Sequence, residues 1–298
     1  MRMNTQLKQQ TWGFSGSFRA MASPCELLIA TDDKQVAMQM LQLASDEAQR
    51  IEAKYSRFIS ANVLWQINHA QGKSVAIDAE TYQLLLFAQQ CYQLSDGLFD
   101  ISAGKLMRLW RFDKNSAIPT PEILNQALLA VDFEQVKFTT TELQIPTEMY
   151  LDFGGIGKEY AVDRVANTLA QRWPDISVLV NFGGDIACPV KRVAECSPWQ
   201  VGIEDPQRLD QALVSLQIRQ GALATSGDTR RYIELDGVRY GHIINPKTGY
   251  PVVHAPRSVT VLGPNCLTAG MLATMAMLQG EQAEDFLTEQ QVQFKIYR

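Results

Sequence analysis

Apolar residues recur every three or four positions over several stretches of the chain, which is the spacing of a helix that buries one face. The clearest stretch runs from Asp33 to Tyr55, and Asp32 or Asp33 can cap its first turn. A Met-rich stretch, with Asn265 as its cap, runs through Leu278. The same spacing predicts further helices at 62–69, 79–94 and 121–130, from the glycine cluster near 154 to about 173, and at 281–288.

Short apolar runs bounded by turn residues predict strands. Residues 12–19 and 25–30 form a strand pair around the turn at 20–24, and a loop with two prolines covers 113–121. Further short strands are predicted at 74–77, 135–138, 142–145, 149–151, 178–181 and 292–297, together with a β-rich region at 198–262. Mixed helices and antiparallel strands predict an α+β fold. The length permits one large domain or two of average size, and with no linker or repeat we expect residues 1–298 to form a single domain.

The charge balance narrows the function classes. The 298 residues carry 27 Lys plus Arg against 32 Asp plus Glu, a net charge of −5. With no Lys/Arg block, the chain lacks the phosphate-neutralising surface of a nucleic-acid protein and has no polybasic membrane anchor. The beginning of the chain has no apolar core of signal-peptide length, and no apolar run is long enough to span a membrane.

The cysteines and histidines bear on the cellular compartment and on the kind of metal site that can be expected. The five Cys, an odd number without a C-x-x-C pair, indicate reduced thiols, and a cytoplasmic location is therefore expected. The three His show no H-E-x-x-H spacing, so a His-rich metal site is not expected. His69 and His254 stand in unpatterned polar stretches, where surface placement is the better interpretation.

The first candidate for chemistry is the stretch DFGGIGKEYAVD, from Asp152 to Asp163. Three glycines at the start of a helix let a ligand approach the backbone, and the free N–H groups there suit phosphate. Lys158, one turn into the helix, can add a charge-assisted contact. The spacing is neither G-x-G-x-x-G nor a Walker loop, so a glycine-rich turn that only packs tightly is an equally good interpretation.

Two further segments combine glycine with polar groups. In NFGGD, a strand from 178 opens into Gly-Gly and Asp185, which can present a carboxylate to a ligand or form a plain hairpin turn. In the second, His242 lies in a polar, glycine-rich setting, where a neutral imidazole can act as a general base. A structural histidine is the commoner case.

The Met-rich helix is the last candidate. Gly270 and Thr274 are one helical turn apart and share a face, so the Thr274 hydroxyl can reach a metal ion. The methionines at 271, 275 and 277 are more simply explained as core.

Taken in order, these segments resemble the FAD:protein FMN transferase family, also called ApbE-type flavin transferases. The similarity extends from about Phe18 to Gly280. The matching pieces are RAMASP (19–24), IEAKYSRFISANVLWQIN (51–68), SDGLFDISAGKLMRLWRF (95–112), LDFGGIGKEYAVDRV (151–165), VNFGGDI (180–186), LATSGDTRRY (223–232), HIINPKTGYPV (242–252) and LATMAML (272–278).

The resemblance implies a T-fold-like α+β architecture, with antiparallel sheets, packed helices and a central FAD cleft. Such enzymes cleave FAD, transfer FMN through a phosphoester bond to a Ser/Thr of a target flavoprotein, and release AMP. Mg²⁺ bridging the phosphates belongs to this chemistry, so the implied cofactors are FAD as substrate and Mg²⁺.

The family's site residues can be carried over to matching positions. Met21 matches a flavin-pocket residue, Phe58 an aromatic that stacks on the cofactor, and Ile243 or Ile244 a residue lining the flavin site. Leu98, Phe99 and Asp100 match the segment beside the adenosine. Asp152 and Lys158 match cofactor-binding positions in the glycine turn, and Gly155 the residue whose carbonyl reaches the metal. His242 matches the group that takes the proton of the incoming hydroxyl, a role that an oxygen bound to the cation could also fill.

One departure bears directly on the metal. The family helix reads A-D-x-L-x-T, in which Asp and Thr both bind the cation, whereas here the run is AGMLAT and Gly270 replaces the Asp. Because Mg²⁺ favours carboxylate oxygen, its binding should weaken unless phosphates, water or Asp185 compensate. An FAD-binding protein with weak or no catalysis and a metal-dependent FAD pyrophosphatase are therefore alternatives. On this basis, Gly270→Asp is expected to raise Mg²⁺-dependent turnover.

Overall fold

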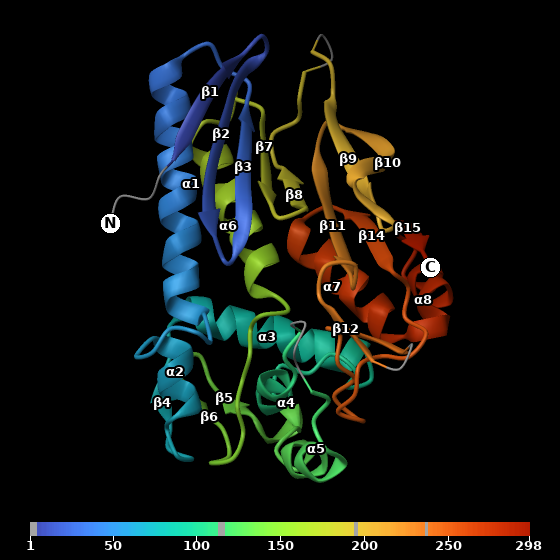
Figure 1. The fold of residues 1–298 in the computed structure, drawn as a ribbon. Coiled ribbons are helices and arrows are strands. Elements are labelled where there is room, and N and C mark those ends of the chain that lie inside the picture. Colours follow the sequence, from blue (N-terminus) through green and yellow to red (C-terminus); the bar gives the residue numbers. More distant parts are fainter. Residues whose placement is uncertain (1–4, 113–116, 194–195, 236–237) are drawn as a thin grey trace.

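A single antiparallel sheet forms the frame of the protein (Figure 1). The computed structural model describes residues 5–112, 117–193, 196–235 and 238–298. Within these ranges the sheet has eight strands. In spatial order they are β1 (Gln6–Gln10), β2 (Gly13–Ala20), β3 (Ser23–Ile29), β7 (Val178–Phe182), β8 (Asp185–Cys188), β11 (Gly221–Gly227), β14 (Ser258–Gly263) and β15 (Gln293–Tyr297).

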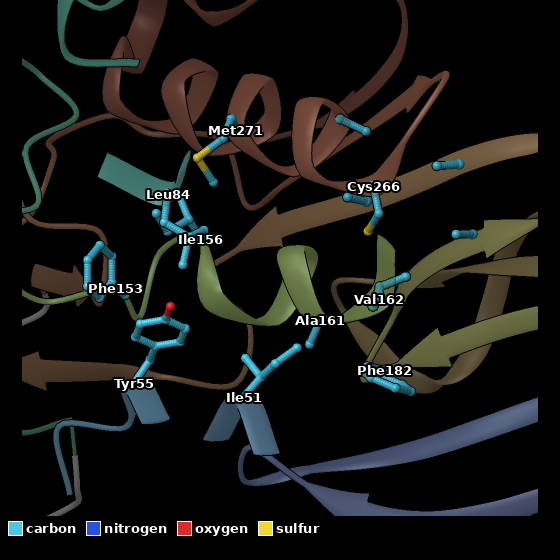
Figure 2. Packing of buried hydrophobic residues seen from close by; sticks show 14 of the residues in the cluster. Ile51, Tyr55, Leu84, Phe153, Ile156, Ala161, Val162, Phe182, Cys266 and Met271 are labelled. Atoms are coloured by element: carbon cyan, nitrogen blue, oxygen red, sulfur yellow. The ribbon is translucent and has the colours of Figure 1, made fainter. Parts of the chain in front are cut away.

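Three helices cover one face of this sheet. They are α1 (Lys34–Tyr55), α6 (Gly157–Arg172) and α7 (Cys266–Leu278). Helix α1 packs on β2, α6 on β7 and β8, and α7 on β11 and β14, and α6 contacts both other helices. Figure 2 shows the contact: Ile156 and Val162 of the α6 region lie between Ile51 of α1 and Met271 and Cys266 of α7. The main hydrophobic core is therefore the layer between sheet and helices.

A hairpin covers part of the opposite face. It is formed by β9 (Trp199–Asp205) and β10 (Arg208–Ile218). Trp199, Val201 and Ile218 of this hairpin pack on Leu179 and Ile186 of the main sheet. Because side chains alternate across a strand, Leu179 faces this hairpin while Val178 and Val180 face the helices.

The remaining elements form the other end of the molecule (Figure 1). A second, smaller core joins helices from the first half of the chain to the segment around His242, and the Trp110 Nε1–H donates to the Gly249 carbonyl at 2.8 Å. The elements of this end are α2 (Val63–Asn68), β4 (Val75–Ala76), α3 (Ala79–Leu94), α4 (Gly104–Leu109), α5 (Pro121–Leu128), β5 (Lys137–Phe138), β6 (Glu142–Gln144), β12 (Tyr232–Leu235) and β13 (Val238–Gly241). The chain closes with α8 (Ala283–Glu289) and β15.

The α+β fold expected from the sequence is confirmed, and so are the predicted helices, to within a few residues at their ends. Asp33 caps α1 by accepting hydrogen bonds from Gln35 N and Val36 N, and Asn265 caps α7 through Thr268 N. The strand pair at 12–19 and 25–30 is β2 and β3. Parts of the predicted loop at 113–121 and of the β-rich region, at 113–116 and 236–237, lie outside the described residues.

The predicted strand at 149–151 is wrong. Only Tyr150 forms an isolated bridge, to Ala103. The side chain of Asn68 takes the place of a strand partner, because its Oδ1 accepts from Leu151 N at 2.7 Å and its Nδ2 donates to Leu151 O at 2.9 Å. The elements without a counterpart in the prediction include the polar edge strand β1, which lacks apolar alternation, the short helix α4, strand β8 and the 3₁₀ turn Phe133–Gln135.

Candidate active site

The glycine turn before α6 is held by its own backbone and by one aromatic contact. Ile156 N and Gly157 N donate to Phe153 O at 3.0 and 2.8 Å, and Phe153 is buried. A Cβ placed on Gly155 would lie 3.2 Å from Cε2 of Phe99. The lack of a side chain at 155 therefore lets Phe99 pack against the turn, which brings two predicted site segments together.

Lys158 forms an ion pair with Asp185. Its Nζ lies 2.7 Å from Oδ2 of Asp185, whose side chain is only 2% exposed. Burial lowers the pKa of the Lys158 ammonium, but the carboxylates of Asp185 and Glu159 outweigh it and raise the pKa, so the lysine keeps its charge. The first turn of α6 thus carries a cation that its ion pair holds in place.

A tight hairpin places Asp185 in this position. Phe182 pairs with Asp185 across a two-residue turn, in which Gly183 and Gly184 have φ values of 63° and 100°. Glycine adopts these values without strain, so the hairpin interpretation of NFGGD is confirmed. The same turn approaches the β2–β3 turn, because a Cβ on Gly183 would lie 2.9 Å from Ser23 Oγ and 3.9 Å from Lys158 Nζ. The hairpin thus holds the Asp185 carboxylate beside Lys158, and its presentation to a ligand stays a prediction.

Glu159 is a buried carboxylate that the sequence analysis did not single out. It is 8% exposed, and its side chain packs against the bare backbone of Gly270 on α7. Burial and the neighbouring Asp185 carboxylate raise the pKa of Glu159 above its usual range. Its i, i+4 spacing from Asp163, which also faces α7, is the sequence signal that could have indicated it.

Asp163 fixes the two helices relative to each other. Its carboxylate accepts from Cys266 N and Leu267 N, both at 2.8 Å, so it satisfies two free N–H groups at the start of α7. The methionines at 271, 275 and 277 are buried, and the interpretation of this face as core is confirmed. Thr274 lies one turn beyond Gly270, and its Oγ1 lies 3.4 Å from Ser226 Oγ on β11.

His242 lies in the segment that the smaller core holds. Its Nδ1 is buried and has no hydrogen-bond partner among the described residues, and its ring meets Phe112 edge-on at 6.3 Å. Burial, with a contribution from Arg231, lowers the pKa of His242 to about 4. The imidazole is therefore neutral at pH 7, which is the form that can accept a proton.

This pKa predicts a pH-dependent stability. The unfolded chain binds a proton at His242 near pH 6.5, whereas the folded protein binds it only near pH 4, so between these values the unfolded state holds more protons. Stability should therefore fall as pH falls through this window, by up to about 3 kcal/mol relative to His242→Gln. Urea unfolding of both proteins between about pH 7 and about pH 4.5 measures the difference. Parallel pH dependence in the two proteins would contradict it.

The other predicted residues lie around this centre in different settings. Met21 is partly buried at the β2–β3 turn with a φ of 51°, and Ile243 packs against the main core. Phe58 is 84% exposed beside the guanidinium of Arg57, which lies 4.9 Å from the ring centroid. Arg57 also forms an ion pair with Asp152. Asp152 is therefore already engaged by a cation and by Gly154 N at 2.8 Å.

Two of the cavities in the described part of the chain bear on the predicted site. One of about 610 Å³ is lined by Asp100, Asp96, Asp132 and Lys247, so Asp100, a predicted site residue, borders an open space. Burial raises the pKa of Asp100. Leu98 and Phe99 lead into this segment, and Leu98 packs on the main core. The other cavity, of about 730 Å³, lies between β10, β14 and the end of the chain, away from Lys158. The predicted central FAD cleft corresponds to neither cavity and stays a prediction.

The donors near Lys158 suit a hard divalent cation. No cluster of three or more His, Cys, Asp or Glu side chains able to hold a metal occurs among the described residues. Glu159 and Asp185, however, each have a buried carboxylate oxygen without a hydrogen-bond partner in that part of the chain. Two carboxylates with a threonine hydroxyl fit Mg²⁺, which takes its remaining ligands from water and substrate phosphates. The residues present therefore fit the metal that the resemblance implies.

A glycine turn, a helix start and a partly buried lysine beside two buried carboxylates define an α+β protein with a site suited to phosphate groups and a divalent cation. The sequence profile of the ApbE family matches residues 21–297. The chain therefore belongs to the ApbE family.

Individual relatives agree with this assignment. The FAD:protein FMN transferase of Vibrio cholerae is 36% identical over 221 residues, which cover 72% of this chain and 65% of that protein. The Haemophilus influenzae protein of the same name is 31% identical and covers 78% of this chain and 70% of its own length. The chain thus spans slightly under two thirds of the length of the Vibrio relative.

Solved structures confirm the fold. The ApbE protein of Thermotoga maritima superimposes with a TM-score of 0.85 at 27% identity, covering 98% of this chain and 94% of that one. The flavin transferase ApbE of Vibrio cholerae gives a TM-score of 0.79 at 28% identity, with 98% and 94% coverage. No helix among the described residues has the length and apolar character needed to cross a membrane.

Proposed function

We propose that this protein is an FAD:protein FMN transferase. A hydroxyl oxygen of a target flavoprotein attacks the phosphorus of the FMN half of FAD, the bond to the bridging oxygen breaks, and AMP leaves with that oxygen. The observation that carries the proposal is the Lys158–Asp185 pair at the glycine turn, within a chain that belongs to the ApbE family.

Phosphoanhydride cleavage requires that negative charge be neutralised where it develops. Lys158 would bind the phosphates, with help from the Gly155 N–H of the glycine turn, since Gly157 N already donates to Phe153 O. Met21 and Ile243 would line the flavin site, and Phe58 would stack on the flavin. Its 84% exposure leaves the ring face opposite the Arg57 guanidinium for this contact.

The acceptor hydroxyl must lose its proton during transfer. His242 is our proposal for the base, because its imidazole is neutral at pH 7 and Nδ1 is unpartnered among the described residues. Leu98, Phe99 and Asp100 would border the adenosine, and Asp152 would position the turn through its bond to Gly154 N.

We also propose Mg²⁺ as the cation. Thr274 and the Gly155 carbonyl would hold it, together with carboxylate oxygen at the start of α6. When bound, it would neutralise charge on the phosphate oxygens. Phosphate binding, the contacts to flavin and adenosine, and removal of the proton would all be carried out by groups of the protein itself.

The partner is inferred to be a flavoprotein with an exposed Ser or Thr. We place the protein in the cytoplasm because all five cysteines are free thiols, four of them buried, as in a reducing compartment. We further propose that residues 1–298 work as one domain, since the main core draws on elements from β2 to α8.

Incubation with FAD, Mg²⁺ and a target domain carrying an acceptor Ser/Thr tests the proposal. We expect in-gel flavin fluorescence on the target, and its loss when the acceptor residue is replaced by alanine. AMP release without a labelled target would indicate an FAD pyrophosphatase instead. Bound FAD with neither product would indicate a binding protein.

A further inference from the structure

Two buried carboxylates beside Lys158 lack part of the bonding they need. Glu159 is 8% exposed and Asp185 1%, and Oε2 of the first and Oδ2 of the second accept no hydrogen bond from the described residues. Lys158 lies near Oδ2 as an ion-pair partner, without the alignment of a hydrogen bond. A buried acceptor atom without a hydrogen bond lowers the stability of the fold, so these two oxygens indicate a ligand that completes their bonding.

The position of Glu159 relates it directly to Gly270. A Cβ built on Gly270 would lie 2.5 Å from Cγ of Glu159 and 3.2 Å from both its Cδ and its Oε1. The Glu159 carboxyl group thus occupies the space into which a side chain at 270 would extend. The bonds from Asp163 to Cys266 N and Leu267 N, one turn along both helices, fix this contact.

We propose that Glu159 supplies, from α6, the carboxylate metal ligand that α7 lacks at Gly270, and that it acts together with Asp185 and Thr274. This inference rests on the proposed function, because the proposed transferase reaction is what requires a divalent cation. Thr274 is on the same face of α7 as Gly270, one turn away, so a cation near the Glu159 carboxylate is on the side that the threonine faces.

The neighbouring carboxylates are already engaged. Asp152 is paired with Arg57 and accepts from Gly154 N, and both oxygens of Asp163 accept from the start of α7. Among the acidic residues of the described ranges, Glu159 and Asp185 have a buried oxygen without a hydrogen-bond partner, and that of Asp185 also forms the ion pair with Lys158. They give the two carboxylates that Mg²⁺ commonly uses beside phosphate.

The geometry also changes the expectation for Gly270→Asp. In the presence of Glu159, the new Cβ would collide with Cγ, which is near the backbone and cannot move aside as a side-chain tip could. We therefore expect the single variant to melt at a lower temperature than the wild type and to gain no affinity for metal.

Metal binding can be measured without flavin transfer. Mn²⁺ is titrated by electron paramagnetic resonance in the presence of ADP, which carries the adenosine pyrophosphate half of FAD. We expect Glu159→Gln and Glu159→Ala to weaken Mn²⁺ binding at least about tenfold. Glu148→Gln, in an exposed ion pair with Lys105, is the matched control and should bind Mn²⁺ as the wild type does.

A second experiment transfers the carboxylate from position 159 on α6 to position 270 on α7. Glu159→Ala removes the atoms that would collide at 270, so Glu159→Ala/Gly270→Asp should regain Mn²⁺ affinity to within about threefold of wild type. Glu159→Ala/Gly270→Ala makes the same helix change without a carboxylate and should not regain it.

Unchanged Mn²⁺ affinity in both Glu159 variants would overturn the proposal, as would an absence of Mn²⁺ binding by the wild type. A folded Glu159→Ala/Gly270→Asp protein that binds Mn²⁺ as weakly as Glu159→Ala would also overturn it. Failure of the transferase proposal has a different readout: wild-type protein that binds Mn²⁺ with ADP but labels no target.

Discussion

Replacing His242 with alanine is expected to slow FMN transfer about 10²–10⁴-fold, the usual loss when a general base is removed. Because burial keeps the pKa of His242 near 4, the wild-type imidazole is already unprotonated at neutral pH. Affinity for FAD should change little, since we propose Lys158 and the glycine turn, and not His242, as the phosphate-binding groups. Single-turnover transfer rates at saturating FAD measure the first effect, and fluorescence titration with FAD measures the second.

His254 offers the control for this prediction. It is exposed and has a φ of 57°, a conformation that asparagine tolerates better than alanine, so His254→Asn is the suitable change. This variant should transfer FMN at the wild-type rate. Wild-type transfer by His242→Ala would remove His242 from the mechanism.

Replacing Lys158 with methionine is expected to cost both stability and affinity. Breaking a buried ion pair by removing one partner destabilises proteins by roughly 3–5 kcal/mol, and the 27% exposure of the lysine places the loss near the lower value. Losing one charge-assisted bond to phosphate should weaken FAD binding by roughly 10²-fold. Urea unfolding and FAD titration without a divalent cation measure the two effects.

A double variant separates the two losses. In Lys158→Met/Asp185→Asn the unpaired charge is gone, and Asn can still accept from Thr225 N, which lies 3.4 Å from Oδ1 in the wild type. Stability should largely return while FAD affinity stays low. Recovery of FAD affinity together with stability would show that Lys158 supports the fold and does not bind phosphate.

Features set by neighbouring residues could be predicted from the sequence. The periodicity over 79–94 gives the bounds of α3, and the Gly-Gly pair gives the hairpin that carries Asp185. The order of the motifs gives the family. In each case the determining interactions are local, or the pattern is shared with known proteins.

Features set by contacts between distant segments could not. Leu151 is bound by the Asn68 side chain, so an apolar run that resembles a strand does not form one. In the sequence, Glu159 looks like an ordinary polar residue near the start of a helix, and its burial is visible only in the packing of α6 against α7. Its relation to Gly270 depends on the crossing of two helices, which Asp163 fixes and which no local pattern encodes.

In a flavin transferase, cleavage of FAD is coupled to transfer of FMN. The most direct measurement is the ratio of AMP released to target molecules that gain one FMN, with AMP determined by chromatography and the target by intact mass. We expect a ratio of about one, and no AMP when the acceptor hydroxyl is absent. AMP that accumulates equally with and without the acceptor would contradict it.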